Sequence, residues 1–141
     1  MPAITDSRNL TRQRIGLTML GAALSMTLWT SIAQASPVGT WKTEADKKGQ
    51  TALVEAKPCG AGLCGTMVEV FDASGNQINH PNVGKRLFWD MVPSGDAYEG
   101  RAYVPALNLE VNGTLKINGD TMKVGGCAGP VCQSQTWRRV D

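Results

Sequence analysis

Apolar and polar residues alternate in short runs over most of the chain from residue 39 to the C-terminus. In residues 51–57, for example, Ala52, Val54 and Ala56 fall on one face. A repeat of two residues is typical of β-strands, whereas a helix repeats every 3.6 residues. The pattern therefore predicts an all-β domain, with strands at Gly39–Thr43, Thr51–Lys57, Gly65–Phe71, Arg86–Val92, Ala97–Val104, Leu107–Val111, Thr114–Ile117, Thr121–Gly125 and Gln133–Val140.

The same alternation assigns faces to the third and fourth predicted strands. It places Val68 and Val70 on one face of the third strand. It places Leu87, Trp89 and Met91 on one face of the fourth strand, opposite Phe88, Asp90 and Val92.

Turn-forming residues separate the predicted strands. Asp72–Asn76 is a turn, and Gln77–Gly84 continues it as a polar loop. Asn112-Gly113 and Asn118-Gly119 are the strongest hairpin signals, because both residues of a type I′ turn need positive φ. They predict a tight meander through the sixth, seventh and eighth strands.

Eight or nine short antiparallel strands joined mainly by tight turns predict a small up-and-down β-barrel. A two-sheet β-sandwich is the alternative. Closure into a barrel removes exposed strand edges, so we expect a monomer. The strands are short, and the barrel is therefore either filled by its own side chains or left with a small cavity.

The first 35 residues have the pattern of a cleavable secretory signal peptide. Arginines at 8, 12 and 14 precede an uncharged stretch from 15 to 32, and Ala33-Gln34-Ala35 is a small-x-small cleavage site. The alternative is a membrane anchor, because 18 residues just reach the length of a span, but Ser and Thr dilute the stretch. We expect cleavage after Ala35, export to the periplasm or beyond, and one domain over residues 36–141 that does not span a membrane.

Charge excludes one class of partner. The signal peptide holds three of the 14 basic residues and one of the 12 acidic ones, which leaves 11 of each in residues 36–141. A neutral domain without a basic stripe is not typical of nucleic-acid binding. We therefore expect no nucleic-acid partner.

The cysteines form two pairs, each with four residues between its members: Cys59 with Cys64, and Cys127 with Cys132. In an exported protein an even number of cysteines indicates disulfides. The Gly and Pro residues between the members bend the chain, which favours the local pairs 59–64 and 127–132 and places them in connections between strands. A four-cysteine zinc site is the alternative, but an oxidising compartment disfavours it, and we expect no metal.

A tryptophan near the start and two arginines near the end indicate how the barrel closes. Gly39-Thr40-Trp41 begins the first predicted strand, and Arg138 and Arg139 end the last one. A Gly-x-Trp in the first strand and an Arg in the last close one end of barrels of the lipocalin kind, where the guanidinium stacks on the indole. Arg138 and Arg139 point to opposite faces, and the sequence does not decide which one lies inside.

Binding is the remaining functional signal. The candidate ligand-binding residues are aromatic side chains and one cation: Phe88, Trp89, Tyr98, Tyr103 and Arg101. Trp89 and Tyr103 would line a cavity mouth, with Arg86 or Arg101 holding an anionic head group. Core packing is the alternative explanation for each aromatic residue.

Catalytic patterns are weak. His80 is the only histidine, and a loop histidine that hydrogen-bonds its own turn explains it. The strand carboxylates are explained by outward-facing positions, and no Gly-rich loop precedes a helix. We expect no enzymatic activity and no cofactor.

Several motifs together resemble a family of small exported bacterial proteins that carries only a domain-of-unknown-function label. The motifs are Gly39-Thr40-Trp41, Cys59-Gly60 with Leu63-Cys64-Gly65, Asn79 with Asn82, Tyr103-x-Pro105, Gly126-Cys127, and Thr136-Trp137-Arg138-Arg139. The resemblance implies a lipocalin-like β-barrel in the periplasm and transfers no catalytic residues. Two functions follow as expectations: a module that binds a small apolar or amphipathic ligand, or a filled barrel that acts as an envelope or protein-interaction module.

Overall fold

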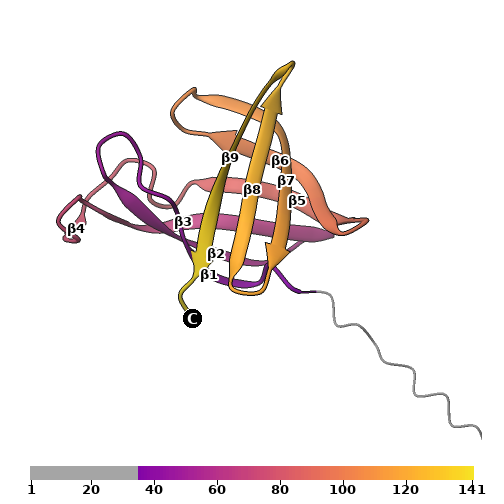
Figure 1. The fold of residues 1–141 in the computed structure, drawn as a ribbon, viewed down its shortest axis with the longest axis horizontal. Helices are drawn as coiled ribbons and strands as arrows, with labels where there is room; N and C mark the ends of the chain where they lie inside the picture. Colours follow the sequence, from indigo (N-terminus) through magenta and orange to yellow (C-terminus); the bar gives the residue numbers. More distant parts are fainter. Residues whose placement is uncertain (1–34) are drawn as a thin grey trace, which may run out of the picture. The chain divides into compact units, whose positions relative to one another are not determined.

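The computed structural model describes residues 35–141, and the signal peptide predicted over residues 1–35 lies outside them except for Ala35. The described part of the chain is all β (Figure 1). Its strands are β1 (Gly39–Lys42), β2 (Thr51–Cys59), β3 (Gly62–Phe71), β4 (Gln77–Ile78), β5 (Arg86–Ser94), β6 (Ala97–Val104), β7 (Leu109–Asn118), β8 (Thr121–Ala128) and β9 (Val131–Arg139).

Eight of these strands close into an antiparallel barrel. The strand order is β2-β1-β9-β8-β7-β6-β5-β3, and β2 also pairs with β3, which completes the ring. The short β4 pairs with the outer edge of β3 within the stretch predicted as a loop. The predicted up-and-down barrel is confirmed, and the sandwich alternative is excluded because the ring has no break between two sheets.

One of the two predicted Asn-Gly hairpins is wrong. Asn118-Gly119 does turn the chain between β7 and β8, and Gly119 has a φ of 59°. Gly113 instead lies in the middle of β7, so the predicted strands Leu107–Val111 and Thr114–Ile117 form one element. A Cβ on Gly113 would lie 2.7 Å from the Cβ of Ala102, and this close packing explains the glycine.

Two β-bulges overturn the predicted faces. On β3, Leu53 pairs with Glu69 and Val54 with Met67, which leaves Val68 between them without a partner. Met67 and Val70 are therefore buried, and Val68 is exposed rather than sharing the face of Val70.

On β5 the register shifts between Trp89 and Val92, and Asp90 has a φ of 52°. Consequently Phe88 and Met91 are both buried, whereas Trp89 is only partly buried. The opposing Gly100 allows this bend, because a Cβ there would lie 2.7 Å from the carbonyl oxygen of Asp90.

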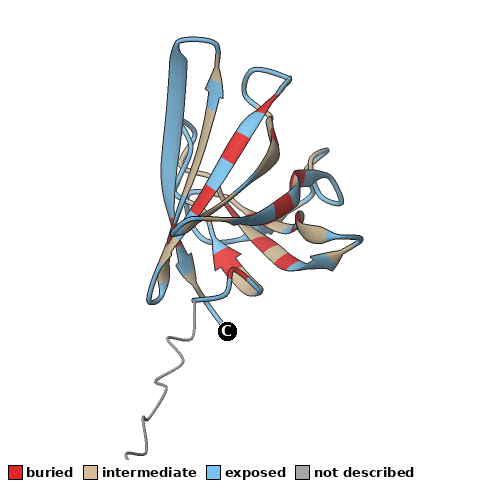
Figure 2. Ribbon diagram, turned by 90° about the vertical axis from the view of Figure 1, so that its right-hand side faces the viewer, coloured by how far each residue is buried: buried red, intermediate tan, exposed pale blue. Residues whose placement is uncertain are grey.

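Burial differs along the barrel strands. Figure 2 shows buried residues in several strands, while the part of β9 from Val131 to Thr136 is exposed. We call the end that holds Ser36–Val38 and the β2–β3, β5–β6 and β7–β8 turns the closed end. The open end holds the β1–β2, β4–β5, β6–β7 and β8–β9 connections.

The structure holds both favoured disulfides, one near each end. Cys59–Cys64 bridges the β2–β3 hairpin with its Cα atoms 5.8 Å apart, and Cys127–Cys132 bridges the β8–β9 hairpin with its Cα atoms 4.0 Å apart. The cysteines lie in the strands and not in the connections as predicted, because neighbouring antiparallel strands supply the distances that a disulfide needs.

Removing a disulfide is expected to cost only about 2 kcal/mol of unfolding free energy, because each closes a short loop. The Cys59→Ala/Cys64→Ala variant should lose more than Cys127→Ala/Cys132→Ala, since Cys64 is buried and both Cys127 and Cys132 are exposed. Urea unfolding of both variants measures this. A larger loss for the exposed pair would contradict the expected order.

Candidate functional site

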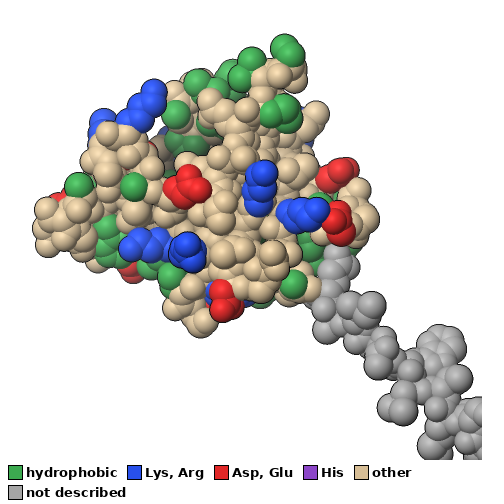
Figure 3. Space-filling view, in the orientation of Figure 1, with side chains coloured by type: hydrophobic (Ala, Val, Ile, Leu, Met, Phe, Trp, Pro, Cys, Tyr) green, Lys and Arg blue, Asp and Glu red, His purple; other side chains and the backbone are tan. Residues whose placement is uncertain are grey.

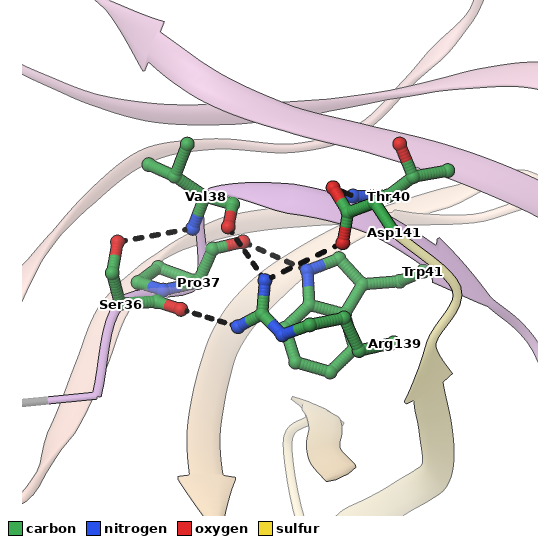
Figure 4. Close-up of polar contacts among 7 residues, drawn as sticks. All are labelled: Ser36, Pro37, Val38, Thr40, Trp41, Arg139 and Asp141. Carbon is green, nitrogen blue, oxygen red and sulfur yellow. Dashed lines mark hydrogen bonds and ion pairs between the residues drawn. The ribbon is translucent and has the colours of Figure 1, made fainter. Parts of the chain in front are cut away.

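The closed end is sealed by Trp41 and Arg139 (Figure 4). Trp41 is fully buried, and its indole Nε1 donates a hydrogen bond of 2.8 Å to the carbonyl oxygen of Pro37. The guanidinium carbon of Arg139 lies 4.3 Å from the centre of the indole ring. Arg139 Nη1 also donates to the Val38 carbonyl at 2.8 Å, and Nη2 donates to the Ser36 carbonyl at 2.9 Å.

The last residues of the chain complete this seal. The Thr40 backbone N–H donates to the Asp141 carboxylate at 2.8 Å, and Arg139 pairs with the same carboxylate at 3.7 Å. Gly39 has a φ of 138°, and a Cβ there would lie 2.9 Å from Asp141 Oδ2. Arg139 is thus the arginine that stacks on Trp41, whereas Arg138 is exposed. Together these contacts cover the closed end of the barrel.

A cavity of about 470 Å³ opens at the other end. Its apolar walls and floor come from all sides of the barrel: Ala52, Met67, Val70, Leu87, Ala102, Val104, Val124 and Trp137. The volume lies within the range of small-molecule sites. We call this hollow the open-end cavity.

Polar groups surround the rim of the open-end cavity. Gln133 and Gln135 line it from β9, and Gln135 Oε1 accepts a hydrogen bond of 2.8 Å from the indole of Trp137. Glu44 Oε1 accepts from the Thr136 backbone N–H at 2.7 Å. The cavity therefore combines an apolar floor with a polar rim.

His80 and Asp46 lie in the loops at the rim. His80 Nδ1 accepts a hydrogen bond of 3.1 Å from the Asn82 backbone N–H, which places this histidine in its own turn. The Asp46 carboxylate accepts the backbone N–H groups of Lys48 and Gln50, at 2.8 and 2.9 Å. These bonds give both loops a defined shape beside the cavity.

A second concavity lies on the outside of the barrel. It has a volume of about 350 Å³ and is lined by Lys85, Arg86, Trp89, Tyr103 and Glu110. We call it the outer groove. Its residues come from β5, β6, β7 and the loop that precedes β5.

The predicted ligand-binding residues do not share one site. Phe88 is fully buried in the core, with its ring 6.3 Å from that of Trp137, and it is unavailable to a ligand. Tyr98 packs against the core and lines neither concavity. Trp89 lines the outer groove instead of a cavity mouth, because it lies on the face opposite the buried Phe88. Arg101 lies beside it, and Tyr103 borders both concavities.

Trp137 at the floor and Gln133 and Gln135 at the rim line the cavity but were not among the predicted ligand-binding residues. The spacing of these three residues in the sequence could have predicted that they share one face. Once Trp137 is placed inside, the two-residue repeat places Gln135 and Gln133 on the same inner face.

Among residues 35–141, two carboxyl groups have a shifted pKa, those of Asp72 and Asp96, and both lie outside the two concavities. Hydrogen bonds from the Asn76 and Ser74 backbone lower the pKa of Asp72, and the hydrogen bond and charge of Lys116 lower that of Asp96. Among residues 35–141, no three His, Cys, Asp or Glu side chains are placed to hold a metal ion. In the same residues no helix is long and apolar enough to cross a membrane.

This barrel was compared with known proteins and families. The chain is similar to the solved structure of protein HP1028 from Helicobacter pylori, which is described as belonging to the lipocalin family. The two are 14% identical with a TM-score of 0.58, over 76% of this chain and 84% of that one, a likeness that shows the fold. A comparison with curated proteins finds no match. The model of a family described as "Uncharacterized protein conserved in bacteria (DUF2147)" matches residues 39–139, and the chain therefore belongs to this family.

Proposed function

We propose that this protein binds a small amphipathic ligand in the open-end cavity and acts as a carrier or sensor of it, without catalysing a reaction. The observation that carries the proposal is the cavity of about 470 Å³, with its apolar floor and polar rim, at the end opposite the Trp41–Arg139 seal. A hollow of this size favours binding over the alternative of a filled barrel. The lipocalin-like fold is consistent with this use.

The arrangement of the cavity suggests how the ligand lies. Its apolar part contacts Trp137 and the aliphatic side chains beneath the rim, where burial removes apolar surface from water. Its polar group remains at the rim. Lys48 and His80 at the rim can donate hydrogen bonds to this group, and so can the side-chain amides of Gln133 and Gln135.

We further propose that the ligand is met in the periplasm. The signal-peptide pattern of residues 1–35 and the two disulfides support export to an oxidising compartment. Fractionation of cells that express the full chain checks this. The exported protein should have the mass of a chain beginning at Ser36, and a full-length mass in the cytoplasm would contradict export.

Filling the cavity should abolish binding of an amphipathic fluorescent probe such as 11-(dansylamino)undecanoic acid. Val124→Trp places a large side chain in the cavity wall, and we expect it to weaken probe binding at least tenfold, about 1.4 kcal/mol. Lys123→Trp is the matched control, because the neighbouring Lys123 is exposed and outside the lining. It should change binding less than twofold.

Fluorescence titration of protein purified from the periplasm measures both variants, and circular dichroism verifies that each is folded. Equal probe affinity in Val124→Trp and the unaltered protein would overturn the proposal. Native mass spectrometry of the same preparation then asks which natural ligand is retained. A bound mass that is present in the Lys123→Trp variant and lost in Val124→Trp identifies the occupant of the cavity.

A further inference from the structure

The outer groove is not part of the open-end cavity, and its composition is unusual for the outside of this barrel. Trp89 pairs with Arg101 across β5 and β6, and Arg101 pairs with Asn112 across β6 and β7. Tyr103 pairs with Glu110 in the neighbouring row. Cross-strand partners share a face, so an indole, a phenol and a guanidinium meet on one outward surface.

The groove is also locally cationic. Lys85 and Arg86 line it and Arg101 borders it, against one carboxylate, that of Glu110. Residues 36–141 as a whole hold equal numbers of basic and acidic residues. The excess of positive charge is therefore a property of this surface and not of the domain. Figure 3 shows one face of the domain, where basic and acidic side chains are scattered among uncharged ones.

Hydrogen bonds hold the groove in shape before anything binds. The Tyr103 hydroxyl donates to Asn108 Oδ1 at 2.9 Å, and Lys85 Nζ lies 5.7 Å from the centre of the Tyr103 ring. Arg101 Nη1 donates to Asn112 Oδ1 at 2.8 Å. Ordered side chains lose little conformational freedom when a ligand arrives, which favours binding.

The ion pairing of the groove leaves cationic groups for a ligand. The Arg101–Glu110 pair is long, at 3.9 Å, and both side chains are substantially exposed. The side chain of Arg86 makes no hydrogen bond or ion pair with residues 35–141. An arginine side chain without such partners can bind a carboxylate or phosphate through two parallel N–H···O hydrogen bonds.

We propose that the outer groove is a second binding site, for a small anion carried on a flat aromatic ring. The ring stacks on Trp89 beside Tyr103, and its phosphate or carboxylate pairs with Arg86 and Lys85. The groove volume of about 350 Å³ suits a single ring system and its anionic group. A long anionic polymer fits less well, because the surrounding domain is neutral.

The indole N–H signals of the protein report which site is filled. Trp41 and Trp137 are buried and their Nε1 groups are hydrogen-bonded inside the protein, whereas Trp89 is partly exposed in the groove. We expect 1-naphthyl phosphate, added to ¹⁵N-labelled protein purified from the periplasm, to shift the Trp89 signal while the Trp41 signal stays in place. Loss of one signal in Trp89→Phe assigns it.

Two related compounds test the contributions of the ring and of the charge separately. 1-Naphthol has the ring without the charge, and inorganic phosphate has the charge without the ring. Both should bind at least tenfold more weakly than 1-naphthyl phosphate. Equal affinity for inorganic phosphate would indicate an adventitious ion only and would overturn the proposal, as would equal affinity for the neutral ring.

Variants separate this site from the open-end cavity. Lys85→Gln/Arg86→Gln should weaken binding of 1-naphthyl phosphate about tenfold and remove most of its salt dependence. Lys116→Gln/Lys123→Gln removes two exposed cations outside the groove and should have no effect. If Val124→Trp abolished the Trp89 shift, or if Trp137 shifted in its place, the compound would occupy the open-end cavity and the second site would be rejected.

Discussion

Replacing Trp41 with alanine is expected to lower the free energy of unfolding by about 3–5 kcal/mol, the usual cost of truncating a fully buried tryptophan. Trp41 is 0% exposed and lies where β1 joins β2 to β9. The pairing of β1 with β9 covers only Trp41 with Arg139 and Lys42 with Arg138. The indole therefore supports the shortest pairing in the barrel ring.

The stack on Arg139 adds to the loss. Without the indole, the guanidinium loses a contact worth about 1–2 kcal/mol when partly desolvated, and the Pro37 carbonyl loses its donor. Total stabilities of small domains are about 5–15 kcal/mol, so Trp41→Ala removes a large fraction. Thermal unfolding should show a fall in Tm on the order of 15–25 °C.

Two arginine variants serve as controls for the Trp41 prediction. Arg138→Ala removes an exposed side chain and should cost less than about 0.5 kcal/mol. The loss of unfolding free energy in Arg139→Ala should lie between those of Arg138→Ala and Trp41→Ala, because Arg139→Ala removes the stack and the hydrogen bonds to Ser36 and Val38. Urea unfolding measures all three. A cost under about 1 kcal/mol for Trp41→Ala would show that the seal is peripheral to stability.

The two Asn-Gly pairs show why the sequence predicts this fold well but not completely. The dipeptide at 118–119 turns the chain, and the one at 112–113 does not. Their local chemistry is the same, and the difference is tertiary: Gly113 is buried against Ala102 and Met91. Alternation and turn residues predict the number and order of strands, whereas packing across the barrel decides whether a glycine bends the chain or makes room.

The candidate sites were less predictable for a related reason. A single bulge at Asp90 places Phe88 and Met91 on the same buried face, whereas strict alternation places them on opposite faces, and bulges leave little trace in a two-residue repeat. The choice between Arg138 and Arg139 likewise depends on which face of β9 meets Trp41. By contrast, the disulfide pairs followed from the cysteine spacing and the Gly and Pro residues between the members, because both are local hairpin contacts.

Phe88→Ala is expected to cost about 3–5 kcal/mol, because Phe88 is fully buried and contacts the Trp137 ring. Gly65, which faces the Phe88 ring across β3 and β5, provides a second test of this packing. A Cβ built on Gly65 would clash with the Phe88 ring, so Gly65→Ala alone should cost about 1–3 kcal/mol through overpacking. In the Phe88→Ala background the added methyl group instead fills part of the vacated space.

A double-mutant cycle therefore should show that the two costs do not add. The Gly65→Ala/Phe88→Ala variant should be at least about 1 kcal/mol more stable than the sum of the single variants predicts. Gly126→Ala is the matched control, because its Cβ would meet Val111, and its cost should persist in both backgrounds. If Phe88→Ala left stability unchanged but weakened probe binding, Phe88 would belong to the ligand site, as its sequence position first suggested, and not to the core.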